Sequence, residues 1–149
     1  MNTQIKNPIV HPYLSFEGRC EEALNFYTKT IGAKVDMVMR FKDAPPGNED
    51  CAGGGTPPPG DKVMHASFHV GESMLMATDG MCSGKAAFQG ISLSLSLPTE
   101  ADADRVFNAL ADGGQVMMPL GKTFFAKSFG MVVDKFGVCW MIIVPAPMP

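Results

Sequence analysis

Hydrophobic and polar residues alternate strictly in two segments of the chain. From Ile91 to Leu97 every second residue is apolar, and the residues between them are all serine. Residues 10–16 alternate in the same way, with Val10 and Leu14 on the apolar side. Such alternation is typical of a β-strand that is buried on one face. Both segments are therefore predicted as strands whose apolar faces, including Val10 and Ile91, lie under a helix.

Two other segments have the 3.6-residue periodicity of an amphipathic helix. In residues 18–31 an apolar stripe begins at Cys20, and Gly32 follows as a stop signal. In residues 99–112 the stripe follows Thr99, which is a suitable N-cap, and Gly113 and Gly114 end the helix. The two stripes superpose on each other, which indicates an internal repeat.

The remaining apolar segments are predicted as strands, at 34–42, 62–70, 73–79, 115–124, 127–134 and 138–144. Written in order, the elements form the pattern βαβββ twice. The sequence therefore predicts an α+β fold of duplicated βαβββ modules, roughly residues 8–80 and 88–145, within a single domain spanning 1–149. The Gly- and Pro-rich segment Asp43–Asp61 is predicted as a surface loop or lid.

One helix per module can cover only one face of a sheet. We therefore expect the helices on the outer face of curved mixed sheets, whose opposite faces enclose a cleft for a ligand. His11, Tyr13 and Ser15 lie on the uncovered side of the first strand, and the serines of 91–97 do so in the second module. Alternation alone leaves open a solvated sheet face or a subunit interface.

Composition narrows the class of protein. The chain is 46% hydrophobic and only 18% charged, which excludes wholesale disorder, and its net charge of −3 argues against nucleic-acid binding. No signal peptide begins the sequence and no apolar run is long enough to span a membrane. The four cysteines are scattered without a C-x-x-C pair, which favours reduced thiols in the cytoplasm.

Several stretches resemble the PhnB-like branch of the vicinal-oxygen-chelate superfamily, which includes glyoxalase I, bleomycin-resistance proteins and extradiol dioxygenases. They cover nearly the whole chain, and the Asp-Lys-Phe-Gly-x-x-Trp-Met motif is the most specific part. The stretches are His11-Pro-Tyr-Leu-Ser-Phe-Glu-Gly-Arg-Cys-Glu-Glu-Ala, Asn25-Phe-Tyr, His69-Val-Gly-Glu-Ser-Met-Leu-Met-Ala-Thr-Asp and Phe129-Gly-Met-Val-Val-Asp-Lys-Phe-Gly-Val-Cys-Trp-Met. The resemblance implies a homodimer that binds a small organic molecule.

Metal-dependent members of that superfamily take ligands from the first and last strand of each module. The resemblance places these positions at His11, Met76, Gly90 and Met141 in this sequence. Only the histidine suits a hard divalent ion, and a catalytic zinc-type site needs about three such ligands. We therefore expect no divalent-metal centre and no cofactor.

The predicted ligand-binding residues combine these positions with the polar strand faces: His11, Tyr13, Met74, Met76, Ser92, Ser94, Cys139 and Met141. His11 is the candidate catalytic residue, because an imidazole can accept and donate a proton near neutral pH. The sulfur ligands could also form a soft Cu(I) site, although strand methionines more often fill space or line pockets. His65 and His69 share a strand face about 13 Å apart at 3.3 Å per residue and cannot chelate one ion.

The leading hypothesis is a small-molecule-binding protein of this family, able to catalyse a metal-free lyase- or isomerase-type step. One alternative is a non-catalytic binder that sequesters a drug or toxin, as bleomycin-resistance proteins do. A second alternative is a metal-dependent isomerase, lyase or dioxygenase. A ubiquinone methyltransferase is not expected, because the sequence has no Gly-rich strand–turn–helix fingerprint for an adenosyl cofactor.

Overall fold

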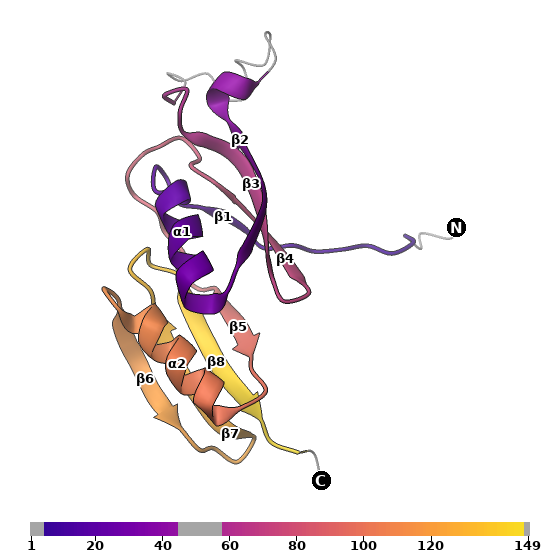
Figure 1. The fold of residues 1–149 in the computed structure, drawn as a ribbon, viewed down its shortest axis with the longest axis vertical. Coiled ribbons are helices and arrows are strands. Elements are labelled where there is room, and N and C mark those ends of the chain that lie inside the picture. Colours follow the sequence, from indigo (N-terminus) through magenta and orange to yellow (C-terminus); the bar gives the residue numbers. More distant parts are fainter. Residues whose placement is uncertain (1–4, 45–57, 148–149) are drawn as a thin grey trace.

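Two four-stranded sheets, each with its own helix, follow one another along the long axis of the molecule (Figure 1). The computed structural model describes residues 5–44 and 58–147. Most of the predicted loop Asp43–Asp61 lies outside the described residues. In chain order the elements are β1 (Tyr13–Ser15), α1 (Cys20–Ile31), β2 (Lys34–Arg40), the short 3-10 helix η1 (Phe41–Asp43), β3 (Val63–Val70), β4 (Ser73–Thr78), β5 (Ser92–Ser96), α2 (Glu100–Ala111), β6 (Gln115–Gly121), β7 (Ala126–Val133) and β8 (Cys139–Pro145).

The two sheets have the same topology. The first has the strand order β1-β4-β3-β2 and the second β5-β8-β7-β6. In each sheet the first strand of the module pairs in parallel with the last, and the other pairs are antiparallel. The predicted α+β fold of duplicated βαβββ modules is confirmed. We call β1 to β4 with α1 the first module, and β5 to β8 with α2 the second.

Both helices bury the stripes that the periodicity predicts. In α1 the buried face includes Cys20, Leu24 and Tyr27, and the helix ends at Gly32 in the left-handed conformation with φ of 68°. In α2 the Thr99 side chain accepts a hydrogen bond from the backbone N–H of Asp102 at 3.1 Å, as expected of an N-cap.

The N-terminus of α1 is capped by the side chain of Asp79, which is distant in sequence, because the residue at the N-cap position makes no such hydrogen bond. Asp79 follows β4 and is 1% exposed. Its Oδ1 accepts hydrogen bonds from the backbone N–H groups of Gly18 and Cys20, and its Oδ2 accepts one from Val63 at 2.6 Å. A negative charge at a helix N-terminus also interacts favourably with the helix dipole. Asp79 therefore holds the start of α1 against the start of β3.

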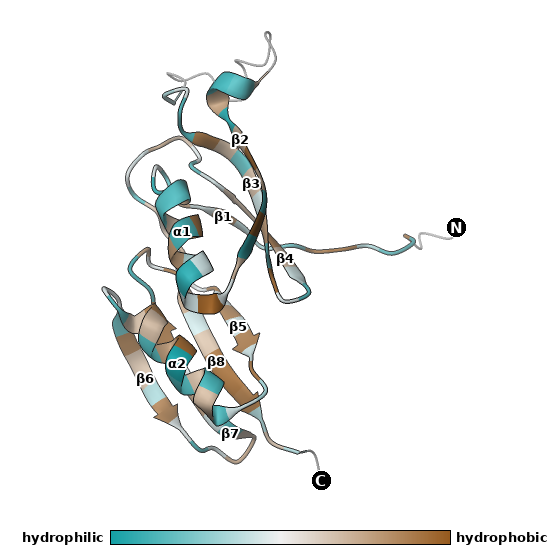
Figure 2. Cartoon of the chain, viewed as in Figure 1, coloured by the Kyte–Doolittle hydropathy of each residue, from teal (hydrophilic) through white to brown (hydrophobic). Residues whose placement is uncertain are grey.

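The core lies between the helices and the sheets and continues from one module to the other. Tyr27 packs against Phe68 of its own module and against Trp140 of the second, with ring centroids 6.1 and 5.5 Å apart. In Figure 2 hydrophobic colouring runs along several strands, whereas both helices alternate hydrophilic and hydrophobic bands. This distribution is typical of helices that cover a sheet with one side only.

The prediction that Val10 and Ile91 lie under the helices was wrong. Val10 is 94% exposed and Ile91 67% exposed, whereas Leu14 is buried as predicted. The physical reason is strand length: β1 begins only at Tyr13 and β5 only at Ser92, so both residues precede the paired part of their strands. The alternation continues in the sequence beyond the point where a helix covers the chain.

Candidate functional site

The face of the first sheet that points away from α1, here called the first open face, carries methionine, histidine and tyrosine side chains in aligned rows. In one row Tyr13 of β1 pairs with Met76 of β4, which pairs with Ser67 of β3. Ser67 in turn pairs with Met37 of β2. Directly opposite residues in a sheet have side chains within contact distance, so this row is continuous.

Two histidines lie on either side of that row, both on β3. His65 pairs with Met39 and its Nδ1 is 2.8 Å from the Tyr13 hydroxyl oxygen, with which it shares a hydrogen bond. His69 pairs with Met74, and its Nδ1 shares a hydrogen bond with Oδ2 of Asp36. Each imidazole is therefore fixed through one ring nitrogen by a neighbouring side chain.

Tyr13 is half exposed, yet burial raises the pKa of its hydroxyl. The phenol therefore stays protonated and can donate a hydrogen bond throughout the physiological range. Together with His65 it gives the first open face a polar centre among thioethers.

The corresponding face of the second sheet, here called the second open face, is more apolar. Ser92 pairs with Cys139, and Ser94 pairs with Met141, whose other neighbour is Met131. Cys139 is a free thiol and is partly buried. The second open face therefore presents small hydroxyls along its edge strand and sulfur or aliphatic groups behind them.

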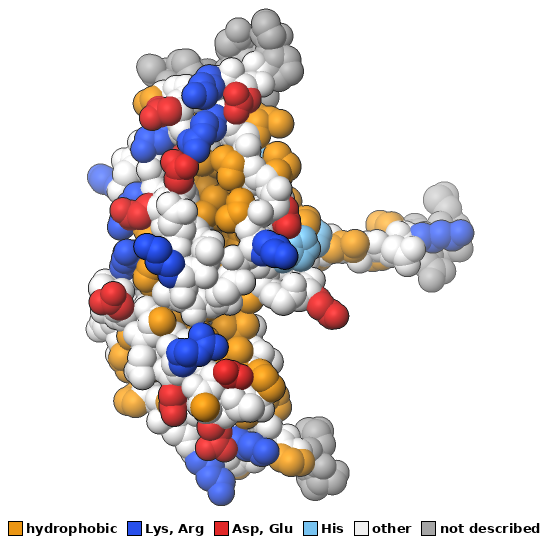
Figure 3. All heavy atoms as spheres, viewed as in Figure 1, with side chains coloured by type: hydrophobic (Ala, Val, Ile, Leu, Met, Phe, Trp, Pro, Cys, Tyr) orange, Lys and Arg blue, Asp and Glu red, His pale blue; other side chains and the backbone are white. Residues whose placement is uncertain are grey.

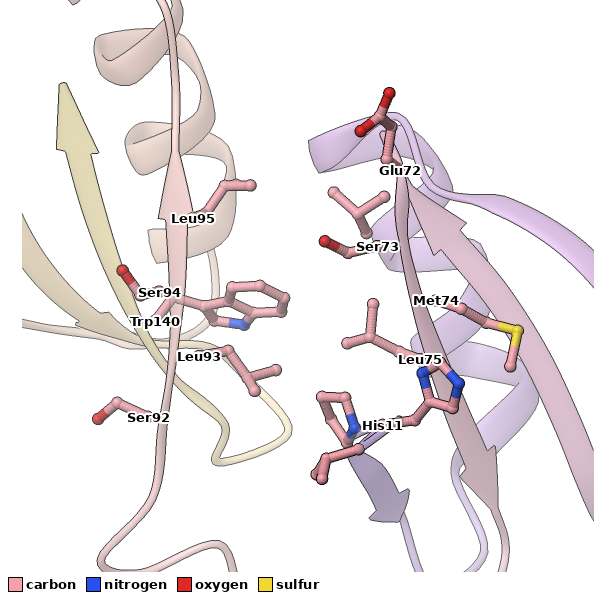
Figure 4. A pocket seen from close by; sticks show the side chains of 13 residues that line it. His11, Glu72, Ser73, Met74, Leu75, Ser92, Leu93, Ser94, Leu95 and Trp140 are labelled. Atoms are coloured by element: carbon pink, nitrogen blue, oxygen red, sulfur yellow. The ribbon is translucent and has the colours of Figure 1, made fainter. Parts of the chain in front are cut away.

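A cavity of about 470 Å³ lies between the two modules. We call it the intermodule groove. Figure 4 shows Leu75 pointing into it from one side, and Leu93, Leu95 and Trp140 from the other. Ser92 and Ser94 belong to the lining strand, but their hydroxyls point away from the gap, and so does the Met74 thioether. The side chains inside this groove are thus mainly those of the helix-facing, apolar side of the sheets.

The structure divides the predicted ligand-binding residues between these surfaces. His11, Met74, Ser92 and Ser94 belong to segments that line the intermodule groove. Tyr13 and Met76 are direct neighbours on the first open face. Cys139 and Met141 lie on the second open face. Within one chain the two sheets follow one another and are not stacked face to face (Figure 1).

The residues at the metal positions of the superfamily do not fit a divalent ion. Among His11, Met76, Gly90 and Met141, only the histidine has a nitrogen or oxygen donor in its side chain. Within residues 5–44 and 58–147, no group of three or more His, Cys, Asp or Glu is placed to hold a metal ion.

Sequence reasoning missed the Tyr13–His65 pair. The two residues are far apart in sequence, and their contact depends on the register of β1, β4 and β3. A period-two count along residues 62–70 does place His65 and His69 on one face. It cannot say which residue of β1 lies nearby, because strand order is a tertiary property.

The chain is similar to a family of known proteins over nearly its whole length. Residues 8–143 match a protein family described as 3-demethylubiquinone-9 3-methyltransferase. Protein YjdN of Escherichia coli is 38% identical over 141 residues, which cover 93% of this chain and 96% of that protein.

Solved structures agree with this similarity. Protein PA1353 of Pseudomonas aeruginosa is 40% identical, with a TM-score of 0.78 over 93% of this chain and 98% of that one. The PhnB protein of Bacillus cereus, named as a candidate 3-demethylubiquinone-9 3-methyltransferase, is 30% identical with a TM-score of 0.74, over 92% and 99% of the two chains. A glyoxalase/bleomycin-resistance/dioxygenase domain of Frankia, 17% identical with a TM-score of 0.63 over 95% and 100% of the two chains, shares the fold.

In the part of the chain that the structure describes, neither helix has the length and hydropathy that crossing a membrane requires.

Proposed function

Since this chain belongs to the family described as 3-demethylubiquinone-9 3-methyltransferases, the PhnB-like branch of the glyoxalase and bleomycin-resistance superfamily, we propose that it binds a small, weakly charged organic molecule on its first open face. The observation that supports this most directly is the row formed by Tyr13, Met76, Ser67 and Met37. Flexible thioethers adapt to apolar ligands, and one phenol–imidazole pair supplies directional hydrogen bonds.

The proposed binding cleft is completed by a second copy of the chain. The two open faces do not oppose each other within one chain, and exposed apolar side chains remain on both sheets, at Met37 and Met118 among others. If the first open face of one subunit packs against the second open face of another, the exposed apolar side chains of both faces are buried. The functional unit is then a homodimer in which residues 8–80 and 88–145 act as the two modules of one domain.

His11 is the proposed acid–base residue of this cleft. It directly precedes the hydrogen-bonded start of β1, where Pro12 O accepts from the N–H of Met76 at 2.9 Å, and it is partly buried. Its ring points away from the intermodule groove, on the same side as the Met74 thioether (Figure 4). An imidazole there can exchange a proton with a bound molecule without a metal ion. The four scattered cysteines, which include no C-x-x-C pair, favour a cytoplasmic protein.

Binding of a neutral fluorescent probe tests this proposal. N-phenyl-1-naphthylamine is apolar and carries one N–H group, so it matches the chemistry of the first open face. Met76→Lys places a charge in the centre of that face and should weaken binding at least tenfold. Met81→Lys, at an exposed loop methionine, is the matched control and should bind normally. Equal affinity of both variants would refute the proposed site.

The His11 assignment has its own readout. In a protein labelled with ¹⁵N on histidine, the ring signals of His11 should shift when the probe is added to the parent chain, but not when the same concentration is added to Met76→Lys. Unchanged His11 signals at saturating probe would remove it from the site.

Methyl transfer is a second candidate function, because the matching family carries that description. A methyltransferase must hold its methyl donor, and equilibrium dialysis with radiolabelled S-adenosylmethionine measures this directly. We expect no saturable binding, since the first strand–turn–helix of the chain has only one glycine, Gly18, between β1 and α1. Stoichiometric binding would favour methyl transfer over the metal-free binder.

A further inference from the structure

Two methionines follow each other along β2 on the first open face. Met37 and Met39 are separated by one residue, so their side chains lie on the same side of the strand, with Cα atoms about 6.6 Å apart at 3.3 Å per residue. The pairing of β2 with β3 runs from Met37 to Met39 without a register shift. Met37 is 39% exposed and Met39 is partly buried. An ion that arrives from solvent can therefore reach both thioether sulfurs.

A histidine lies across from this pair of methionines. His65 of β3 is directly opposite Met39 and diagonal to Met37. Side chains at both kinds of position lie within reach of one another across a sheet when they are long. An imidazole and two thioethers thus belong to one small area of the first open face.

The ring of His65 is already oriented. Its Nδ1 lies 2.8 Å from the hydroxyl oxygen of Tyr13. When Nδ1 carries the proton and donates it to that oxygen, Nε2 keeps a free lone pair for a metal ion. A histidine that binds a metal ion almost always donates its other ring N–H in this way, which fixes the tautomer and the ring orientation.

The chemistry of these donors favours a soft ion. Thioether ligands select Cu(I), and imidazole also suits copper, whereas magnesium, calcium and manganese prefer oxygen ligands. Figure 3 shows acidic and basic side chains interspersed over one face of the molecule, an arrangement that favours ion pairs over a cluster of carboxylates. A hard divalent ion at Met37 and Met39 would find sulfur where it prefers oxygen.

The charged residues that flank the two methionines on β2 also suit a bound cation. Arg40 follows Met39 and forms an ion pair of 2.6 Å with Glu21 of α1. Because α1 covers the opposite face of the sheet, this ion pair holds the guanidinium away from the thioethers. Asp36 precedes Met37, and its carboxylate shares a hydrogen bond with His69 of the first open face.

We propose that Met37, Met39 and His65 form a binding site for a soft monovalent metal ion of the Cu(I) class, with Tyr13 as the positioning residue. The ligands are Nε2 of the imidazole and the sulfur atoms of the two thioethers. The inference goes beyond the proposed function, because it depends neither on an organic ligand nor on His11.

Methionine NMR with Ag(I) tests the site. The probe is silver nitrate in chloride-free buffer, because Ag(I) shares the preference of Cu(I) for soft ligands and is not oxidised in air. All cysteines except Cys20, which is 0% exposed, are replaced by serine so that thiols do not compete. With ¹³C in the methionine methyl groups, one equivalent of Ag(I) should shift the signals of Met37 and Met39. Unchanged signals at both residues, or equal shifts at every methionine, would overturn the proposal.

Substitution of single ligands supplies the second measurement. In the same background, Met39→Leu removes a sulfur at nearly constant size, and His65→Gln removes the ring nitrogen but keeps a polar neighbour for Tyr13. Each should raise the Kd for Ag(I) at least tenfold in isothermal titration calorimetry. Met81→Leu, at a loop methionine that is 49% exposed, is the matched control and should bind like the parent. Equal affinity of these variants would refute the site.

The metal site and the proposed function can fail separately. If N-phenyl-1-naphthylamine binds but Ag(I) leaves the signals of Met37 and Met39 unchanged, the metal site is refuted and the proposed function stands. If Ag(I) shifts both signals in a chain that does not bind the fluorescent probe, the metal site is supported and the proposed function is refuted.

Discussion

The hydroxyl of Tyr27 donates a hydrogen bond of 2.6 Å to Oδ2 of Asp134, which joins α1 of the first module to the β7–β8 turn of the second. Both side chains are buried. The same carboxylate accepts hydrogen bonds from the indole N–H of Trp140 and from the backbone N–H groups of Phe136 and Val138. Burial, reinforced by the neighbouring Asp134, raises the pKa of the Tyr27 hydroxyl far above its usual range.

Loss of this contact should destabilise both modules together. Tyr27→Phe removes one donor from a buried carboxylate and should lower the free energy of unfolding by about 2 kcal/mol. Tyr13→Phe changes the chain's other tyrosine, which is half exposed, and should cost less than about 1 kcal/mol. Urea unfolding followed by tryptophan fluorescence measures the free energy of unfolding of both variants. Equal losses of stability in Tyr27→Phe and Tyr13→Phe would show that the Tyr27 hydrogen bond contributes little.

Asp79 offers a second test of the buried carboxylates. Asp79→Asn replaces one acceptor oxygen with an NH₂ group that faces backbone N–H donors, so at least one of its three hydrogen bonds is lost. We expect a loss of about 2–4 kcal/mol in the free energy of unfolding.

Asp104→Asn is the matched control on the exposed surface of α2 and should change stability by less than about 0.5 kcal/mol. Hydrogen exchange should locate the Asp79→Asn damage in the first turn of α1. Uniform loss of protection throughout the chain would contradict a local capping role.

Alkaline pH should destabilise the protein through Cys20. Burial, with a further effect of the Asp79 and Glu21 charges, raises the pKa of this thiol from 9.0 to about 12. Between these values the unfolded chain loses the proton while the folded chain keeps it, so stability is complete below pH 9 and falls as pH rises towards 12. The slope from one proton is at most about 1.4 kcal/mol per pH unit.

Cys20→Ala should flatten this part of the stability profile. Chemical denaturation at pH 8, 9 and 10 compares the variant with the parent chain. Cys82→Ala is a suitable control, because its thiol is less buried and burial raises its pKa less than that of Cys20. A parent profile that is flat from pH 8 to 10 would contradict the linkage.

The sequence predicted the fold well because its signals are local. The helix stripes from Cys20 and Ala103, the Thr99 cap and the Gly32 stop all depend on neighbours within one or two turns. The positions of Val10 and Ile91 were wrong because strand ends depend on what lies alongside them, which alternation does not encode. Tyr27 shows the same limit, since its contact with Asp134 crosses from one module to the other.

The candidate site was predictable in part. The choice of open faces follows from period-two alternation, and so does the placement of Tyr13 and Met76 on one of them. The pairing of Tyr13 with His65 and the position of the intermodule groove depend on strand register and on how two modules pack. Neither property can be read from a single sequence.

A mixed-dimer experiment tests the central claim, that each cleft combines the first open face of one subunit with the second open face of the other. Met76→Lys blocks the first face and Met141→Lys blocks the second, so neither homodimer should bind N-phenyl-1-naphthylamine. A heterodimer of the two variants, isolated with two different affinity tags, contains one doubly blocked cleft and one intact cleft. We predict that it regains one binding site, half the number of the parent dimer, whereas no recovery would contradict a cleft shared between subunits.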